Sequence, residues 1–436
     1  MSQVIVYTGW VRLMRAFAGA SAVGTALPRR VRGGLAACGA LMILAVAAGC
    51  GSHPAPSPAP GSGQGAGSGS PAAPRATPTS AKLPALAPSQ PAGGPVPSRF
   101  AATSVTFVSA TEAFVLGTAP CATAPCTSIV RTLDRGTSWR GLPAPLVRVG
   151  TPSMTSRPVV WGIRFATAAH GFVFGAGLWE TTDGGEHWRK DTSPSGSILS
   201  LAAIDGQVLA LTIHCSAQAG CSQRGTLLRR PLAGGSWQTV TALRVSLLPG
   251  PTDMIATQGQ EAAILNGRSV VLTRDGGATL TVRGTPCTTV TVGEATSVAV
   301  TGPHSLALLC TGQGFTGHTI KHIYVSSDRG ARWTQAAQPS SVGDAGTIAA
   351  ATPARLSIAT ASAASWLFHS GDAAAHWRTV RTEFDGGMGW ADLGFTTTTD
   401  GVVVHGPANS DGNTRRSPGQ LLFTEDSGVD WHVVRF

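Results

Sequence analysis

An eight-residue pattern, Ser/Thr-x-Asp-x-Gly-x-x-Trp, recurs between Thr132 and Trp431 and constrains the fold more than any other feature of this chain. Four copies are complete; their aspartates and tryptophans are Asp134 and Trp139, Asp183 and Trp188, Asp328 and Trp333, and Asp426 and Trp431. Three copies are incomplete; they retain Asp275, Asp372 with Trp377, and Gly234 with Trp237. The weakest copy has Leu232 at the aspartate place, so the chain repeats one unit seven times.

The spacing of the copies predicts the architecture. The aspartate places, positions 134, 183, 232, 275, 328, 372 and 426, are separated by 49, 49, 43, 53, 44 and 54 residues. One four-stranded propeller blade takes about 40–50 residues. We therefore expect an all-β fold, a single seven-bladed β-propeller of four-stranded antiparallel blades, over residues 98–436.

The residue types of the pattern suit a tight turn between two strands. An aspartate side chain accepts hydrogen bonds from nearby backbone N–H groups, and glycine takes a positive φ without a Cβ clash. The Ser/Thr hydroxyl bonds back to the backbone, and the tryptophan buries its ring on the returning strand. A second pattern precedes the turns, as in VTFVSATEAFVLG and IRFATAAHGFVFG. It predicts two short apolar strands joined by a polar turn, which completes four strands per unit.

Together the two patterns resemble the Asp-box, or BNR-repeat, β-propellers over Ser104 to Phe436. The cadence of GFVFGAGLWETTDGGEHW is similar to that of the photosystem II assembly-factor-like and sortilin-type propellers. The resemblance implies that the aspartates lie on the turn between the third and fourth strands of each blade, away from active sites. It implies no activity, because one fold hosts many functions.

The first fifty residues are of another kind. Arg29, Arg30 and Arg32 precede the apolar run LAACGALMILAVAAGC, which ends at Cys50 after small residues. This order is typical of a bacterial lipoprotein signal, so residues 1–50 are expected to be a leader that ends at a lipidated Cys50. Residues 51–97 are rich in Pro, Gly, Ala and Ser and predict a disordered tether. The protein is therefore expected on the extracytoplasmic face of the cell membrane.

Cysteine usage agrees with export. Apart from Cys38 and Cys50, six cysteines remain, and we predict the pairs Cys121 with Cys126, Cys215 with Cys221, and Cys287 with Cys310. The first two pairs are close in sequence, and the third follows by elimination. Their spacing does not match that of zinc sites, so neither a metal site nor a cofactor is predicted.

Charge excludes one class of partner. Residues 1–50 contribute five of the net ten positive charges, which leaves the chain beyond them near +5. The predicted propeller is almost balanced, and bulk nucleic-acid binding is not expected. The partners expected are the membrane, through the lipid anchor, and an envelope protein or glycan; the pattern says nothing about oligomeric state.

Topology predicts where a ligand binds. In each blade the first and third turns share one face, and the remaining connections share the other, where the longer loops fall. The candidate binding residues on these loops are Trp161, Trp390, Arg157, Arg224, Arg415 and Arg416. Ordinary solvated loop side chains are the competing interpretation.

Catalysis has weaker support. No residue is assigned a catalytic role, because Tyr324 is the one tyrosine after the leader and no sialidase-like arginine pattern is present. Six carboxylates outside the turns keep a paired-carboxylate glycosidase open: Glu112, Asp205, Glu261, Glu294, Asp385 and Asp392. We predict a lipid-anchored binding or assembly module of the envelope; the alternative is a secreted glycoside hydrolase on the same fold.

Overall fold

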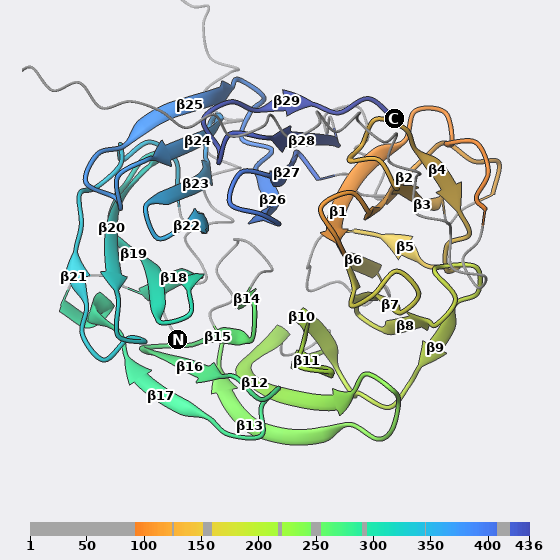
Figure 1. Cartoon of the computed structure of the whole chain (residues 1–436), viewed down its shortest axis with the longest axis horizontal. Coiled ribbons are helices and arrows are strands. Elements are labelled where there is room, and N and C mark those ends of the chain that lie inside the picture. Colours follow the sequence, from red (N-terminus) through yellow and green to blue (C-terminus); the bar gives the residue numbers. More distant parts are fainter. Residues whose placement is uncertain are drawn as a thin grey trace, which may run out of the picture. The chain divides into compact units, whose positions relative to one another are not determined.

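The described part of the chain is a ring of seven β-sheets (Figure 1). The computed structural model describes residues 92–123, 126–150, 159–216, 220–245, 254–289, 294–344, 346–407 and 419–436. Each sheet contains four strands that follow one another along the chain and pair antiparallel, and the second sheet has one further strand. The predicted seven-bladed, all-β propeller is confirmed. Within the described ranges, no helix is long and apolar enough to cross a bilayer.

The strands are short, as expected for blades in which alternate residues pack against the neighbouring sheets. The first three blades contain β1 (Ala101–Phe107), β2 (Ala113–Thr118), β3 (Thr127–Thr132), β4 (Arg140–Leu142); β5 (Arg148–Val149), β6 (Val159–Phe165), β7 (Gly171–Gly175), β8 (Leu178–Thr181), β9 (Arg189–Asp191); β10 (Ser197–Ile204), β11 (Gln207–Ser216), β12 (Gly220–Pro231), β13 (Gln238–Arg244).

The remaining four blades contain β14 (Ile255–Gln258), β15 (Glu261–Asn266), β16 (Ser269–Thr273), β17 (Thr281–Gly284); β18 (Glu294–Gly302), β19 (Ser305–Phe315), β20 (His318–Ser326), β21 (Thr334–Gln335); β22 (Thr347–Thr352), β23 (Arg355–Ala361), β24 (Ser365–Ser370), β25 (Arg378–Glu383); β26 (Trp390–Phe395), β27 (Gly401–His405), β28 (Gln420–Thr424), β29 (His432–Val433). A short 3-10 helix, η1 (Pro286–Thr289), precedes β18.

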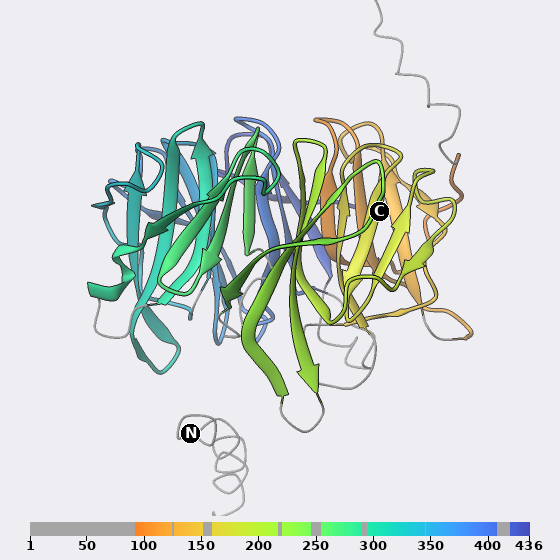
Figure 2. The same cartoon turned by 90° about the horizontal axis from the view of Figure 1, so that it is seen from below.

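The connections divide between two faces of the ring. The first and third turns of each blade, which include the repeated aspartates, lie on what we call the turn face. The second turns and the crossings between blades lie on the loop face. Figure 2 shows the ring from the side, with the long hairpins β11–β12 (green) and β19–β20 (teal) projecting past the blades on the loop face.

Two segments expected as loops are strand extensions. Residues 214–216 and 220–224 continue β11–β12, and residues 311–322 continue β19–β20, with Cys215 opposite Cys221 and Phe315 opposite His318 in the two ladders. The backbone groups go on pairing beyond the blade because each hairpin supplies its own partner strand. Arg224 therefore lies on β12, a strand, and not on a loop.

Two further segments extend the sheets of blades one and two. β5 pairs parallel with β6, which makes the second sheet five-stranded. Gly94 and Gly141 exchange backbone hydrogen bonds of 2.8 and 3.0 Å, so residues 92–97, at the end of the expected tether, lie along the outer strand β4. Each addition gives partners to a strand edge that would otherwise be unpaired.

The ring closes by packing of complete blades. β1–β4 and β26–β29 each form a whole sheet, so no early strand joins the last blade. Asp392 on β26 accepts hydrogen bonds from the Ser104 hydroxyl (2.5 Å) and from the Val105 N–H (2.7 Å) on β1. Arg164 on β6 donates to the other Asp392 oxygen at 2.7 Å. One buried carboxylate thus connects the last, first and second blades.

Candidate functional site

The turn face is built from one repeated hydrogen-bond scheme. In the first blade the Thr132 hydroxyl donates to Asp134 Oδ1 (2.8 Å) and accepts from the Gly136 N–H (2.8 Å). The Ser138 N–H donates to the same aspartate oxygen at 2.8 Å. The same contacts recur around Asp183, Asp275, Asp328, Asp372 and Asp426. The oxygens of these aspartates accept hydrogen bonds from residues of the same turn, so the aspartates stabilise the turn.

The hydrogen bonds hold the turn aspartates in the ionised form. The hydroxyl and N–H of Thr279 lower the pKa of Asp275 to about 2, against a smaller opposing effect of burial. The hydrogen bonds from His376 lower the pKa of Asp372 to about 2 in the same way. A general acid needs a raised pKa, so the chemistry of these turns is structural.

Most of the tryptophans connect a blade to the one before it. Trp188, Trp333 and Trp377 donate from Nε1 to backbone carbonyls of the preceding blade, those of Pro143, Gly284 and Ala337. Trp139 and Trp431 instead donate to the glycine carbonyl of their own turn, at 3.1 and 3.2 Å. The tryptophans therefore cover the gaps between blades and are not presented to a ligand.

The third blade, which lacks the aspartate, is fastened differently. Arg230 is buried and donates to Glu180 (2.6 Å) and Asp191 (3.0 Å) of the second blade. Trp237 Nε1 also donates to Asp191, at 3.1 Å. Burial raises the pKa of Glu180, but the hydrogen bond from His170 and the charge of Arg230 outweigh it and leave the pKa lowered. In the third blade, an ion network with the second blade therefore replaces the hydrogen bonds of the repeated turn.

The carboxylates outside the turns do not form a described pair suited to glycoside cleavage. Glu261 is buried on the turn face and binds Arg274 and Arg329. Asp392 lies between blades and is paired with Arg164. Glu112 and Asp205 lie in first turns, also on the turn face, and the Glu294 side chain lies outside the described part. Glu261 and Asp392 therefore have structural partners.

One group of three metal-capable side chains exists among the described residues, and it lies on a turn. Asp183, Glu186 and His187 approach one another within 4.8 Å. Asp183 already accepts hydrogen bonds from Thr181 and from His187, which is mostly exposed. The group is an exposed part of the turn face.

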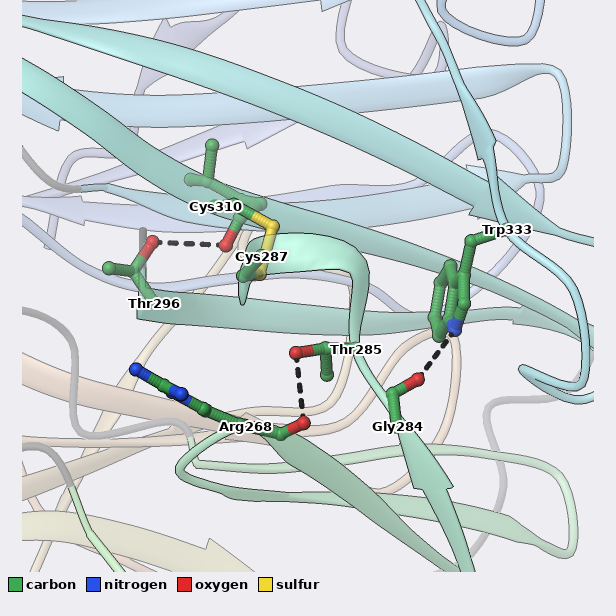
Figure 3. Close-up of a disulfide and its surroundings, with 8 residues drawn as sticks. Arg268, Gly284, Thr285, Cys287, Thr296, Cys310 and Trp333 are labelled. Carbon is green, nitrogen blue, oxygen red and sulfur yellow. Dashed lines mark hydrogen bonds between the residues drawn. A yellow bond between two sulfur atoms is a disulfide. The ribbon is translucent and has the colours of Figure 1, made fainter. Parts of the chain in front are cut away.

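The loop face is held by covalent bonds. The structure contains the predicted disulfides Cys121–Cys126, in the β2–β3 connection, and Cys287–Cys310, which ties η1 to β19 (Figure 3). Cys287 and Cys310 are fully buried. The remaining predicted pair, Cys215 and Cys221, lie opposite each other in the β11–β12 ladder, but their side chains lie outside the described part. Disulfides thus connect strands and loops of the face that lacks the repeated turn.

The sequence-predicted binding residues that the structure describes differ in their exposure. Trp161 is buried, 7% exposed, on the inner strand β6, so it packs inside the propeller and is not presented to a ligand. Trp390 is half-buried; its Nε1 donates to the Thr360 carbonyl at 3.1 Å and its ring packs on His405. Arg224 is exposed on β12. Arg157, Arg415 and Arg416 lie outside the described residues.

A glycine-rich loop beside Trp390 has a buried polar support. The Asp385 carboxylate accepts hydrogen bonds from the Gly387 and Met388 N–H groups at 2.9 and 3.2 Å. The Ser365 hydroxyl and the His405 imidazole also donate to it, His405 at 2.7 Å. Burial raises the pKa of Asp385, yet the hydrogen bond from His405 and the others leave it lowered.

This trio is not a nucleophile triad. A catalytic histidine lies between the serine and the carboxylate, so that it can take the hydroxyl proton. Here Asp385 lies between Ser365 and His405, and the hydroxyl donates to the carboxylate directly. The arrangement fixes the loop conformation and leaves the hydroxyl unactivated.

Two phenylalanines are exposed above this support. Phe315, at the tip of β19, is 60% exposed, and Phe384, at the start of the glycine-rich loop, is 91% exposed. Their segments touch through Ser362: its hydroxyl donates to the Gly317 carbonyl at 3.0 Å, and a Cβ on Gly387 would lie 1.5 Å from its carbonyl oxygen. Only glycine fits there, at φ +78°. Three connections therefore meet at Ser362, and two of them carry an exposed phenylalanine. We call Phe315 and Phe384, on these connections, the phenylalanine surface.

A buried lysine holds the hairpin that carries Phe315. Lys321 Nζ donates to the carbonyls of Thr319, Ser341, Val342 and Gly343 at 2.8–3.1 Å. Burial lowers its pKa to about 8, with a smaller opposing effect of Asp344. The ammonium ties β20 to the crossing into the next blade.

Sequence reasoning missed these loop-face features. The phenylalanine surface, the Lys321 contacts and the Asp385 support depend on which connections meet in space. The one available signal was the DGGMGW segment, Asp385 to Trp390, whose glycines suggest an unusual loop.

The comparisons with known proteins do not assign this chain to a family. No family model and no curated protein matches the sequence. Solved structures similar to it include YCF48 bound to D1 peptide, with 16% identity, 76% of this chain and 93% of that chain covered and a TM-score of 0.44. YCF48 from Cyanidioschyzon merolae has 16% identity, 66% and 87% coverage and a TM-score of 0.40. The GH74 xyloglucanase from Xanthomonas campestris has 12% identity, with 76% of this chain and 72% of that chain covered and a TM-score of 0.24. These likenesses assign no ligand or activity to this chain.

Proposed function

We propose that this chain is an exported, lipid-anchored binding module of the cell envelope, which holds a protein partner on its loop face. The observation that carries the proposal is the phenylalanine surface, in which Phe315 and Phe384 are exposed on connections that touch one another. Burying one such side chain is worth about 1.5–3 kcal/mol. Aromatic side chains supported by a rigid base are typical anchors of protein interfaces.

The support beneath the surface favours binding to a preformed site. Asp385, Ser365 and His405 hold the glycine-rich loop, and Lys321 holds the β19–β20 hairpin. A partner then loses less free energy in ordering these connections, because they are already ordered. Among the side chains described on this face, no carboxylate pair favours the glycoside hydrolase alternative, since Asp385 and Asp392 are each engaged by several donors.

Photo-crosslinking in intact cells tests the binding site. A photoreactive phenylalanine analogue at position 384 or 315 should capture one partner protein, identified by mass spectrometry. The same analogue at Val282 or Val433, which are exposed on outer strands, is the matched control. Capture of the same proteins at all four positions, or of none at 384 and 315, would contradict the proposal. Phe384→Ser should reduce recovery of the partner without lowering the melting temperature.

The lipid anchor is a separate part of the proposal. It rests on the basic, apolar and small-residue order that ends at Cys50, a segment outside the described residues. A diacylglyceryl group on Cys50 would supply two acyl chains, enough to hold a protein at a bilayer, and the Pro/Gly/Ala/Ser-rich tether predicted over residues 51–97 would let the propeller stand away from it. Cys50→Ala should abolish incorporation of labelled fatty acid and move the protein from the membrane to the soluble fraction. Continued labelling of the Cys50→Ala chain would exclude this anchor.

A further inference from the structure

The third blade carries an excess of positive charge that the rest of the propeller does not share. Residues 206–252 contain four arginines and neither an aspartate nor a glutamate. The aspartate lost from the repeated turn, where Leu232 stands, is part of this acid-free stretch. Arg230 is neutralised by the second blade, as described above. Its neighbours on the loop face are not neutralised in this way.

Three exposed arginines meet on the loop face of blades three and four. Arg224 and Arg244 lie directly opposite each other on β12 and β13. The Arg244 N–H donates to Asn266 Oδ1 at 2.7 Å, which brings this pair beside the β15–β16 turn that carries Arg268. All three side chains are exposed, and none makes an ion pair with any residue in the described ranges.

Such an arrangement costs stability unless a ligand supplies negative charge. Like charges directly opposite on neighbouring strands are destabilising. Guanidinium groups bind phosphate oxygens through two parallel N–H donors, which makes arginine the preferred residue for phosphate groups. Three of them on one surface fit several phosphates held side by side.

The shape of this part of the loop face indicates which source of phosphate fits. The hairpin β11–β12, on which Arg224 lies, projects past the blades on the loop face (Figure 2). A bilayer surface presents many phosphates side by side, and basic residues near such a surface are attracted to anionic headgroups.

We propose that Arg224, Arg244 and Arg268 bind the phosphates of anionic lipid headgroups, so that the loop face of blades three and four lies on the membrane surface. The site is separate from the phenylalanine contact to a protein partner and does not depend on acylation of Cys50. Each arginine near an anionic bilayer surface contributes about 1 kcal/mol, screened within about 8 Å at physiological salt.

Vesicle binding tests the site. The full chain with Cys50→Ser is mixed with vesicles of phosphatidylcholine alone or with 30 mol% phosphatidylglycerol, and the ratio of the two partition coefficients is measured. The leader is the same in every variant, so its contribution cancels when variants are compared. Changing Arg224, Arg244 and Arg268 to Ser should lower the ratio about 10- to 100-fold, and 0.5 M salt should remove the difference between variants.

The control separates this surface from total charge. Arg140, Arg332 and Arg378 are exposed at the start of outer strands or in the turns before them, near the turn face, and changing them to Ser removes the same charge. The proposal expects the control triple variant to keep the wild-type ratio. It is overturned if both triple variants lower the ratio equally, or if the loop-face variant leaves it unchanged while remaining folded by its circular dichroism melt. Loss of binding to soluble polyphosphate but not to vesicles would also overturn it.

Discussion

The two faces of the propeller are stabilised by different means. On the turn face, each contact of the repeated scheme joins residues at most four positions apart, as from Thr132 to Asp134 and from Ser138 to Asp134. On the loop face, the contacts are disulfides, the Lys321 ammonium and the Asp385 carboxylate, which join different connections. The first face repeats the same chemistry, whereas every blade is different on the second. A face that need not repeat is free to carry a binding site.

The third blade is the exception that tests this comparison, because there the turn face depends on a buried ion network. Arg230→Met should cost about 3–5 kcal/mol at neutral pH, since it leaves Asp191 buried without a described cationic partner and removes the buried cation from Glu180. Arg189→Met is the control: Arg189 pairs with the same Glu180 but is 76% exposed, and its loss should cost less than about 1 kcal/mol. Denaturant unfolding of the two variants measures the difference.

The pH dependence of that variant follows from the sign of the shifts. The pKa values of Glu180 and Asp191 are lowered in the folded protein, so their stabilisation is present above their unfolded values, near 4, and is lost as the pH falls through the folded values. Without Arg230 the same carboxylates gain from protonation. The difference in the free energy of unfolding between the wild type and Arg230→Met should therefore become smaller as the pH falls below about 4. A difference that stays constant with pH would contradict the ion network.

Removal of a disulfide on the loop face should cause the next largest loss of stability. Replacing Cys287 and Cys310 with Ala opens a loop of 23 residues and should cost about 3 kcal/mol, compared with about 2 kcal/mol for Cys121 and Cys126, whose separation is 5. Thermal melts of both double variants under oxidising conditions give the order. If reduction of the wild-type protein left its melt unchanged, the loop face would not depend on these bonds.

Lys321 gives the loop face a dependence on alkaline pH that the turn face lacks. Burial lowers its folded pKa to about 8, below the unfolded value of 10.5, so the unfolded chain binds the extra proton between these values. The free energy of unfolding should rise with pH across this window, by at most roughly 3 kcal/mol, and the Lys321→Met variant should lack the rise. Unfolding curves of both proteins from pH 7 to 10.5 test this, and parallel curves would contradict it.

The smallest expected effect concerns a worn copy of the repeated turn. Ala373 is exposed and has φ +59°, a conformation that the equivalent glycines, Gly184 and Gly276, take without strain. Ala373→Gly should stabilise the protein by about 0.5–1 kcal/mol, because a Cβ costs that much in the left-handed region. Ala375→Gly, two positions on, should not stabilise it. If both substitutions shift the melting temperature alike, backbone strain is not the reason.

Local contacts were predictable from the sequence, whereas contacts between distant residues were not. The blade count and the turn residues were predictable because all partners of Asp134 lie within four positions of it. Arg230 was not, since its partners are 39 and 50 residues away in another blade. The side chains exposed on the loop face were not predictable: Trp161 is buried, and Phe315 and Phe384 lie on connections whose contacts join different blades.

What the sequence by itself determined is the repeated local geometry: seven strand groups, the turns that fasten them, and the Cys121–Cys126 disulfide, whose cysteines lie five residues apart. Only the tertiary structure decided how the ring closes, where Asp392 reaches Ser104 across 288 residues, and which loop-face side chains are exposed. The physical reason is range. A turn is satisfied within its own few residues, whereas the burial of a side chain depends on every segment that packs beside it.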